Sequence, residues 1–181
     1  MRRALDWIVT LAAAALFVLV FEAEVAKPYR IPSESMEPTL HCAKPAQGCR
    51  AGVSDRVIAL RIVYRIRAPR RGDIVVFDAP AAAAAACGRA GTYVKRIVGL
   101  PGETVTERDG TVLVDGRVLH EPYAVRDARS GTWHVPHGSY FVMGDNRAHS
   151  CDSRDWGAVP RSALVGPVDL TYWPPTRLTV R

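Results

Sequence analysis

The sequence lacks several features that would place it in common protein classes. It has no Cys-x-x-Cys pair, and its five histidines are scattered, so the spacing argues against a zinc site. It has no internal repeat, and no stretch after residue 26 is apolar and long enough to cross a bilayer. Convincing helical periodicity is also missing after residue 26. We therefore expect one domain poor in helix, without a metal or another cofactor.

Lysine is scarce as well. Lys27, Lys44 and Lys95 are the only lysines among 24 basic residues, and the formal net charge is +6. This basic balance is compatible with anionic lipid or nucleic acid as a partner. The excess of arginine over lysine favours a general compositional bias instead, and we expect no nucleic-acid partner.

What the chain does contain is a series of short apolar runs separated by Gly and Pro. Such runs, rich in β-branched residues, predict a mostly β domain with antiparallel sheets in a barrel-like arrangement. Asp109-Gly110 and Asp115-Gly116 have the chemistry of hairpin turns, inside a small hairpin and loop extension at about 103–137. The alanine run 81–86 is typical of a flexible loop. Strands are predicted at 57–60, 61–67, 74–77, 93–98, 104–106, 112–114, 140–143 and 168–173, and short turns near 33–36 and 160–164.

The N-terminal segment differs from the rest. Residues 7–21 form fifteen positions without a charge, within a longer apolar stretch over 4–26. This predicts one transmembrane helix in residues 1–26, followed by a β-rich domain over 27–181. A cleaved signal peptide is the alternative, but no small-x-small cleavage site follows the run. Arg2 and Arg3 place the N-terminus in the cytoplasm and the domain on the outer face.

The four cysteines are an even number, which fits disulfides in an exported domain. Cys42 and Cys49 flank a short loop, so a bridge between them is favoured. Cys87 and Cys151 then remain as a second pair, which the spacing alone does not fix.

Ser35 and Lys95 are a candidate nucleophile and base. Ser35 lies between two prolines in PSESMEPTL, which limits the freedom of its loop. On the predicted strand 93–98, Tyr93 and Ile97 share a face with Lys95. Desolvation lowers the pKa of an amine, and only a neutral amine accepts a serine proton. Taken singly, the two segments also fit an ordinary proline-rich loop and a surface lysine.

A dense polar segment, GDNRAHSCDSRDWG, occupies residues 144–157. Such a loop stays ordered only when its groups satisfy one another. Asp152 and Arg154 are suited to pair, and Ser150 to hydrogen-bond a lysine amine. A solvated turn is the alternative, but the density of matched charges favours a structured site.

Four segments, PSESMEPTL, RGDIVVF, YVKRIVGLPGE and GDNRAHSCDSRDWG, follow the apolar N-terminus in that order. Together they resemble the type I signal peptidases (leader peptidases) of bacteria, in a compact form with a single anchor. The resemblance implies a barrel-like β ectodomain and a membrane-anchored serine endopeptidase. It implies removal of signal peptides from exported precursors through an acyl-enzyme, with cutting after small residues in an Ala-x-Ala pattern.

The resemblance also implies residue roles. Ser35 is the implied nucleophile, Lys95 the general base, and Ser33 the side-chain member of an oxyanion hole completed by the Ser35 backbone N–H. Within the supporting set, Ser150 orients the lysine, and Asp152 and Arg154 form an ion pair. The full supporting set is Met36, Arg96, Asp145, Ser150, Asp152 and Arg154.

The resemblance also implies partners and a location for the chain, and other functions remain to be weighed against it. The implied partners are signal-peptide-bearing precursors, the lipid bilayer and, in proximity, the secretion translocon; the implied location is the plasma membrane, single-pass. A maturation peptidase of conjugation systems and a noncatalytic anchored β domain remain alternatives. Self-cleaving repressors use a similar dyad but need a DNA-binding domain, for which the chain has no room. The Cys42–Cys49 loop has no clear counterpart in the family, which leaves fine specificity open.

Overall fold

The computed structural model describes the backbone of residues 2–181 and the side chains of these residues except at positions 2, 4, 5, 20, 22 and 23. The predictions that involve residue 1 and the side chains of Arg2 and Glu22 therefore lie outside the described residues.

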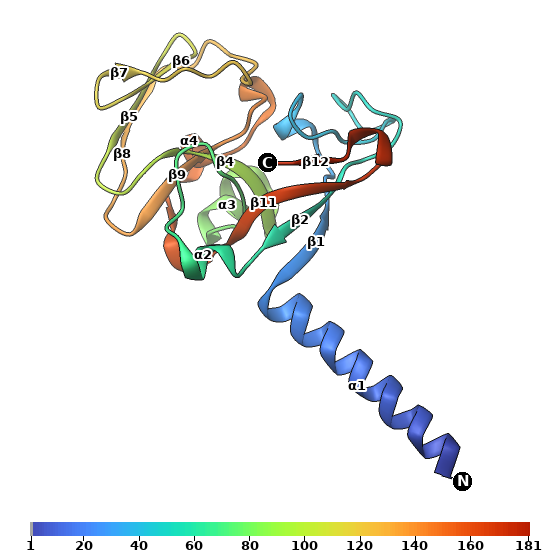
Figure 1. The fold of residues 1–181 in the computed structure, drawn as a ribbon. Helices are drawn as coiled ribbons and strands as arrows, with labels where there is room; N and C mark the ends of the chain where they lie inside the picture. Colours follow the sequence, from blue (N-terminus) through green and yellow to red (C-terminus); the bar gives the residue numbers. More distant parts are fainter. Residues whose placement is uncertain (1) are drawn as a thin grey trace.

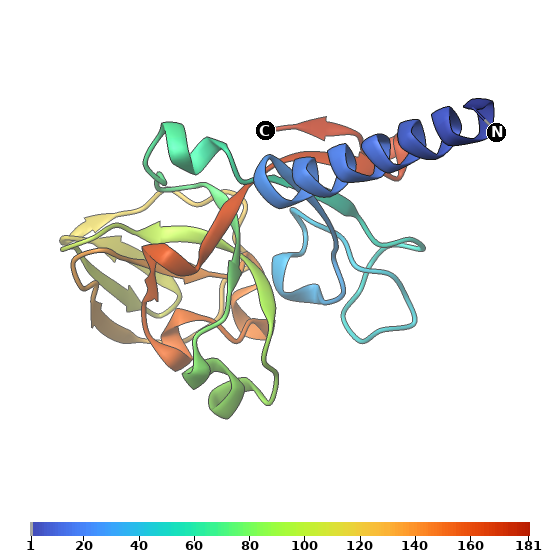
Figure 2. The same cartoon turned by 90° about the horizontal axis from the view of Figure 1, so that it is seen from below.

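Helix α1 (Arg2–Glu24) projects from the β-rich body as a single rod (Figures 1 and 2). Its sequence is rich in alanine and leucine, which favour helix. Its described apolar side chains are exposed, including Trp7 and Phe17 at 68% and 69%. Among the described residues, no helix has both the length and the hydropathy needed to cross a membrane. The N-terminal helix is thus present, whereas its predicted crossing of the bilayer is not confirmed.

The larger sheet contains eight strands in the order β1-β2-β11-β3-β4-β9-β10, with β12 also paired to β11. All of its pairings are antiparallel, and among the described strands β1 and β10 do not pair to close it, so it is a half-barrel (Figure 1). The predicted mostly β, antiparallel fold is confirmed. The strands are β1 (Ala26–Arg30), β2 (Arg56–Leu60), β3 (Ile74–Asp78), β4 (Thr92–Gly99), β9 (Ser139–Met143), β10 (Val159–Pro160), β11 (Leu164–Trp173) and β12 (Thr179–Val180).

A second, four-stranded sheet with the order β7-β6-β5-β8 lies at the upper left of Figure 1. Asp109-Gly110 and Asp115-Gly116 form its two-residue turns, and all four residues have positive φ, as hairpin turns of this length require. We call residues 103–137, which contain this sheet, the small lobe. Its strands are β5 (Thr104–Arg108), β6 (Thr111–Val114), β7 (Arg117–Val118) and β8 (Gly131–His134).

Buried apolar side chains join these parts. One cluster lies between the two sheets, where Val105 and Val112 of the small lobe pack with Phe141 and Met143 of β9. Another packs Met36 against Ile31, Leu40 and residues of β2 and β3, beneath the segment that carries Ser35. The site described below is therefore supported by both sheets.

Two sequence predictions of local structure are wrong. Residues 61–67 do not form a strand, because a turn leads into helix α2 (Val63–Ile66). Tyr64 and Arg67 both donate hydrogen bonds to Asp73. Residues three apart lie on the same face of a helical turn but on opposite faces of a strand. Residues 81–86 are not a flexible loop but belong to helix α3 (Ala81–Cys87), since alanine is the best helix former and Gly88 ends the helix at φ 67°.

The remaining short elements surround the polar segment and the turns. Helix α4 (Ser153–Trp156) is capped by Asp152, whose carboxylate accepts the backbone N–H of Arg154. Single 3₁₀ turns occur at Glu34–Met36, Arg147–His149, Arg161–Ala163 and Pro175–Arg177. The first and third of these lie at the positions where the sequence predicts turns.

Candidate active site

Ser35 lies in a 3₁₀ turn that directly follows β1. The buried Met36, 1% exposed, fixes this turn to the core, and the N–H of Leu40 donates to the Met36 carbonyl at 2.9 Å. Ser33 precedes the turn in extended conformation, and its Oγ lies 3.4 Å from Ser35 Oγ. The two hydroxyls are thus neighbours and partly exposed, as a nucleophile and an oxyanion donor need to be.

A cavity of about 310 Å³ opens between this turn and β4. Ser33, Ser35, Tyr93 and Lys95 all line it. The structure therefore brings together the candidate nucleophile, base and oxyanion donor, although Ser35 and Lys95 are 60 positions apart in the sequence.

Lys95 is 2% exposed, so its side chain is buried. Burial lowers the pKa of Lys95 to about 8, while the nearby Asp152 carboxylate raises it and the Arg154 guanidinium lowers it again. A substantial fraction of the amine is therefore neutral near physiological pH. This is the protonation state in which it can accept a proton.

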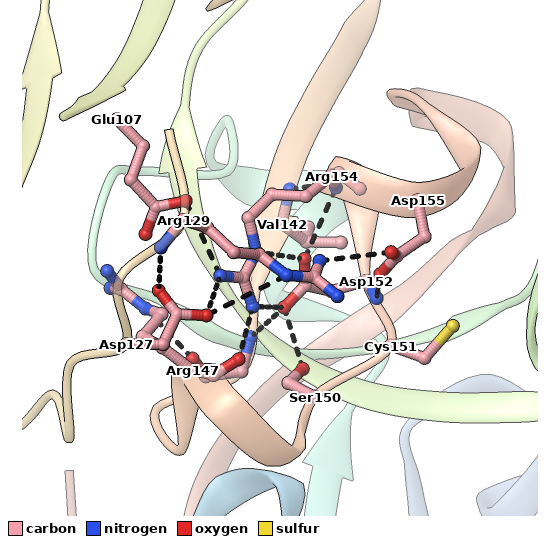
Figure 3. Close-up of polar contacts among 12 residues, drawn as sticks. Glu107, Asp127, Arg129, Val142, Arg147, Ser150, Cys151, Asp152, Arg154 and Asp155 are labelled. Atoms are coloured by element: carbon pink, nitrogen blue, oxygen red, sulfur yellow. Dashed lines mark hydrogen bonds and ion pairs between the residues drawn. The ribbon is translucent and has the colours of Figure 1, made fainter. Parts of the chain in front are cut away.

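The segment after β9 supplies Asp152 and Arg154, whose charges both act on the pKa of Lys95. Figure 3 shows how the polar groups of this segment contact one another. Ser150 Oγ donates to Asp152 Oδ2 at 2.7 Å, and Arg154 Nε donates to Asp152 Oδ1 at 2.8 Å. The Asp152 carboxylate is fully buried, and its bonds to the Arg154 guanidinium help to hold its pKa below the ordinary value, although burial opposes this. Asp152 is thus a fixed anion that determines where the Ser150 hydroxyl lies.

Gly144 is a contact point that the sequence analysis did not single out. A Cβ at this position would lie 2.5 Å from the Ser35 carbonyl oxygen and 2.2 Å from Ser150 Oγ. Only glycine lets the nucleophile turn and the Ser150 loop approach this closely. The N–H of Gly144 also donates to Asp152 Oδ2 at 3.0 Å.

Asp145 and Asn146, which follow Gly144, tie this segment to its neighbours. Arg96 donates to both oxygens of Asp145 at 2.8 and 2.7 Å, and its guanidinium lies 3.8 Å from the centre of the Tyr123 ring. The backbone N–H of Asn146 donates to the Ser35 carbonyl at 3.1 Å. Asp145 thus holds β4 and Asn146 holds the nucleophile turn.

Two disulfides flank the site. Cys42 is bonded to Cys49, and Cys87 of α3 is bonded to Cys151, which lies between Ser150 and Asp152. Cys87, Cys151 and His149 also line the cavity.

Several buried charged residues near the site were missed by sequence reasoning. Glu37 is fully buried and accepts the backbone N–H groups of Cys42 and Arg50. Glu107 and Glu121 of the small lobe are 1% and 5% exposed. The available signal was a glutamate at an inward position of a strand pattern, as at Glu107 after Val105.

The described residues contain no group of three or more His, Cys, Asp or Glu side chains arranged to hold a metal ion.

Comparison with known proteins gives a consistent result. The family model "Signal peptidase, peptidase S26" matches residues 4–173. The chain is 39% identical over 171 residues to a probable signal peptidase I-2 of Synechocystis, covering 93% of this chain and 73% of that protein. It is 38% identical over 177 residues to a signal peptidase I of Leptolyngbya laminosa, covering 96% and 82%.

A crystal structure of a signal peptidase I from Enterococcus faecalis aligns with a TM-score of 0.48 and 32% identity, covering 56% of this chain and 97% of that chain. The family match and the identity to relatives over almost the whole chain show that this protein belongs to the peptidase S26 family of signal peptidases and is a hydrolase that removes signal peptides as a serine protease.

Proposed function

We propose that the chain cleaves signal peptides from exported precursors with Ser35 as nucleophile and Lys95 as general base. The observation that carries this proposal is the buried Lys95 amine, with a pKa of about 8, in the same cavity as the Ser35 hydroxyl. An amine that is partly neutral at physiological pH can activate a serine without a histidine.

In the first half of the reaction, Ser35 Oγ attacks the carbonyl carbon of the scissile peptide bond and Lys95 Nζ accepts the hydroxyl proton. The Ser33 hydroxyl and the Ser35 backbone N–H donate to the oxyanion, an interaction typically worth about 3–4 kcal/mol. The C–N bond then breaks, and Lys95 returns the proton to the leaving amine. This leaves an acyl ester on Ser35.

In the second half, Lys95 takes a proton from a water molecule, which attacks the ester. The C–O bond to Ser35 breaks, the proton returns to Ser35 Oγ, and the signal peptide leaves with a free carboxylate. Ser150, held by Asp152, keeps the lysine amine directed toward Ser35 through both halves.

The substrate binds extended beside the strands that border the cavity, where its backbone groups find strand partners. Tyr93 and Met36 line the cavity together with Ser35. Small residues at the first and third positions before the cut fit such a site, which gives the Ala-x-Ala preference.

Helix α1 attaches the enzyme to the plasma membrane, close to a translocon that delivers the precursors. Its exposed apolar side chains, with Leu11, Leu16 and Leu19 at 65%, 62% and 65%, support this attachment. Because β1 runs directly from α1 to the Ser33–Met36 segment, attachment places the nucleophile near the bilayer, where the precursor's signal peptide lies. Residues 27–181 then form the catalytic domain on the outer face.

The test is cleavage of a precursor carrying Ala-x-Ala by the purified chain in detergent, with mass spectrometry of the products. Ser35→Ala and Lys95→Ala should each abolish cleavage while the circular dichroism spectrum is retained. Appreciable activity in either variant would reject the dyad. Extraction of membranes at alkaline pH tests the attachment: release of the intact chain, like that of a peripheral protein, would contradict a firmly inserted α1.

A further inference from the structure

The small lobe contributes two carboxylates to the group of charges next to Lys95. Arg154 Nη1 lies 3.0 Å from Asp127 Oδ2 and 3.4 Å from Glu107 Oε2. Figure 3 shows both carboxylates on the side of the Arg154 guanidinium that faces the small lobe. The same guanidinium donates through Nε and Nη2 to the two oxygens of Asp152 at 2.8 and 3.0 Å.

Every member of this group is withdrawn from water. The side chains of Glu107 and Asp152 are 0% exposed, that of Arg154 is 1% exposed and that of Asp127 is 9% exposed. A buried guanidinium is directed by the anions that surround it, since no solvent competes for its N–H groups. Glu107 and Asp127 therefore determine where the Arg154 guanidinium lies, together with the Arg147 carbonyl, which accepts from Nη2 at 2.7 Å.

The Glu107 side chain makes its described hydrogen bond with Arg154. Its Oε1 is buried and has no hydrogen-bond partner among the described residues, so its described polar contact is the one with Arg154. Burial raises the pKa of the Glu107 carboxyl, with Arg154 opposing the rise. Burying a carboxylate at an inward position of a sheet lowers the free energy of unfolding unless the charge is paired. The pairing of Glu107 with Arg154 therefore points to a role in holding that guanidinium.

We infer that Glu107 and Asp127 are positioning residues for catalysis, acting through Arg154 and Asp152 on Ser150. The chain of contacts runs from β5 and the β7–β8 loop to Arg154, then to Asp152, and ends at the Ser150 hydroxyl 2.7 Å from Asp152. The small lobe is thereby part of the machinery that aims the lysine. This inference rests on the proposed role of Ser150 and Lys95.

The alternative is that the ion pairs only fasten the small lobe to the main sheet. A matched control exists for this possibility, because Glu103 also joins the lobe to the main sheet. Its carboxylate lies 2.6 Å from Arg71 Nη2 and accepts the Leu100 N–H, and it has no contact with Arg154. Loss of Glu103 weakens the fastening without disturbing the Ser150 loop.

The experiment measures kcat and KM per active site for Glu107→Gln, Asp127→Asn and Glu103→Gln. Active sites are counted by stoichiometric labelling of Ser35 with an acylating serine-directed inhibitor, so partial unfolding does not count as slow catalysis. We expect kcat per site to fall about 10- to 100-fold in Glu107→Gln and Asp127→Asn, with KM unchanged, because a misdirected catalytic group costs this much. Glu103→Gln should keep the kcat of the unmodified chain.

A double variant shows whether the effect passes through Ser150. If it does, Glu107→Gln combined with Ser150→Ala is no slower than Ser150→Ala alone. Unchanged kcat per site in Asp127→Asn and in any folded Glu107→Gln, or additive losses in the double variant, would overturn the inference. Lys95→Ala in the same series separates the two proposals. Activity surviving in Lys95→Ala rejects the dyad, whereas an unchanged kcat per site in Glu107→Gln beside an inactive Lys95→Ala rejects only the positioning role.

Discussion

The two halves of the proposed site are built in opposite ways. The nucleophile half, residues 33–36, presents partly exposed hydroxyls on a short turn and has its main anchor in the buried Met36. The base half is buried and charged: Lys95 is 2% exposed, and the side chains of Asp152 and Arg154 are 0% and 1% exposed. This difference in exposure has a chemical reason: a nucleophile must be reached by its substrate, whereas an amine that serves as a base must be kept from water. The first requirement is met by a loop, and the second by two sheets and a network of ion pairs.

The largest effect that separates the halves is expected at Ser33. Ser33→Ala removes an oxyanion donor from the nucleophile half without altering the buried charges, so kcat should fall about 10²- to 10³-fold with little change in stability. Steady-state cleavage of an Ala-x-Ala precursor measures this. Ser162→Ala, at an exposed serine in another turn, serves as the control. An unchanged kcat would place the oxyanion donor elsewhere.

Gly144 is where the halves meet, and Gly144→Ala should affect both. The added methyl group would clash with both the Ser35 carbonyl and the Ser150 side chain, so both have to move. We expect a free energy of unfolding lower by about 1–3 kcal/mol and kcat lower by about 100-fold. Denaturant unfolding and precursor cleavage measure the two effects. Gly52→Ala is the matched control, since a Cβ there meets nothing within 4 Å; equal behaviour of the two variants would contradict the close approach.

The two disulfides should give the smallest difference in kcat. Cys87→Ala/Cys151→Ala opens a link across 64 positions, worth about 4 kcal/mol of unfolding free energy, and frees the loop between Ser150 and Asp152. Cys42→Ala/Cys49→Ala opens a link across 7 positions, worth about 2.5 kcal/mol, next to the nucleophile half. Only the first pair should lower kcat, by about tenfold. Equal kcat values in the two double variants would show that the Cys87–Cys151 bridge does not hold the base half in place.

The sequence predicts well those elements whose conformation depends mainly on neighbouring residues. The two hairpin turns follow from Asp-Gly pairs, and strands such as 74–77 follow from short β-branched runs. Strand β1 is not predictable in this way, because Lys27 and Pro28 interrupt any apolar pattern and the strand exists only through its pairing with β2. The prediction of a loop for the alanine run gives its low complexity more weight than the high helix propensity of alanine, and the packing of this run beside α4 is a tertiary contact that the local sequence does not show.

The residues of the candidate site also fall into those that local motifs predict and those that depend on distant contacts. The motif resemblance points to Ser35 and Lys95, and the fold brings both to one cavity. Glu107 was missed because its partner Arg154 is 47 positions away, and the burial of a charge depends on that distant contact. Gly144 was missed because nothing in the surrounding sequence shows that two other segments approach its Cα.

The most direct test of the account is the titration of Lys95 itself. The chain has three lysines, so lysine labelled with ¹³C at Cε gives a spectrum simple enough to assign with a Lys95→Met variant of the full chain in detergent. We expect the signal missing from Lys95→Met to titrate with a pKa of about 8, and kcat/KM to rise with pH through the same midpoint because the neutral amine is the active form. A signal that instead titrates at the ordinary lysine value of about 10.4 would contradict a desolvated base and, with it, the proposed mechanism.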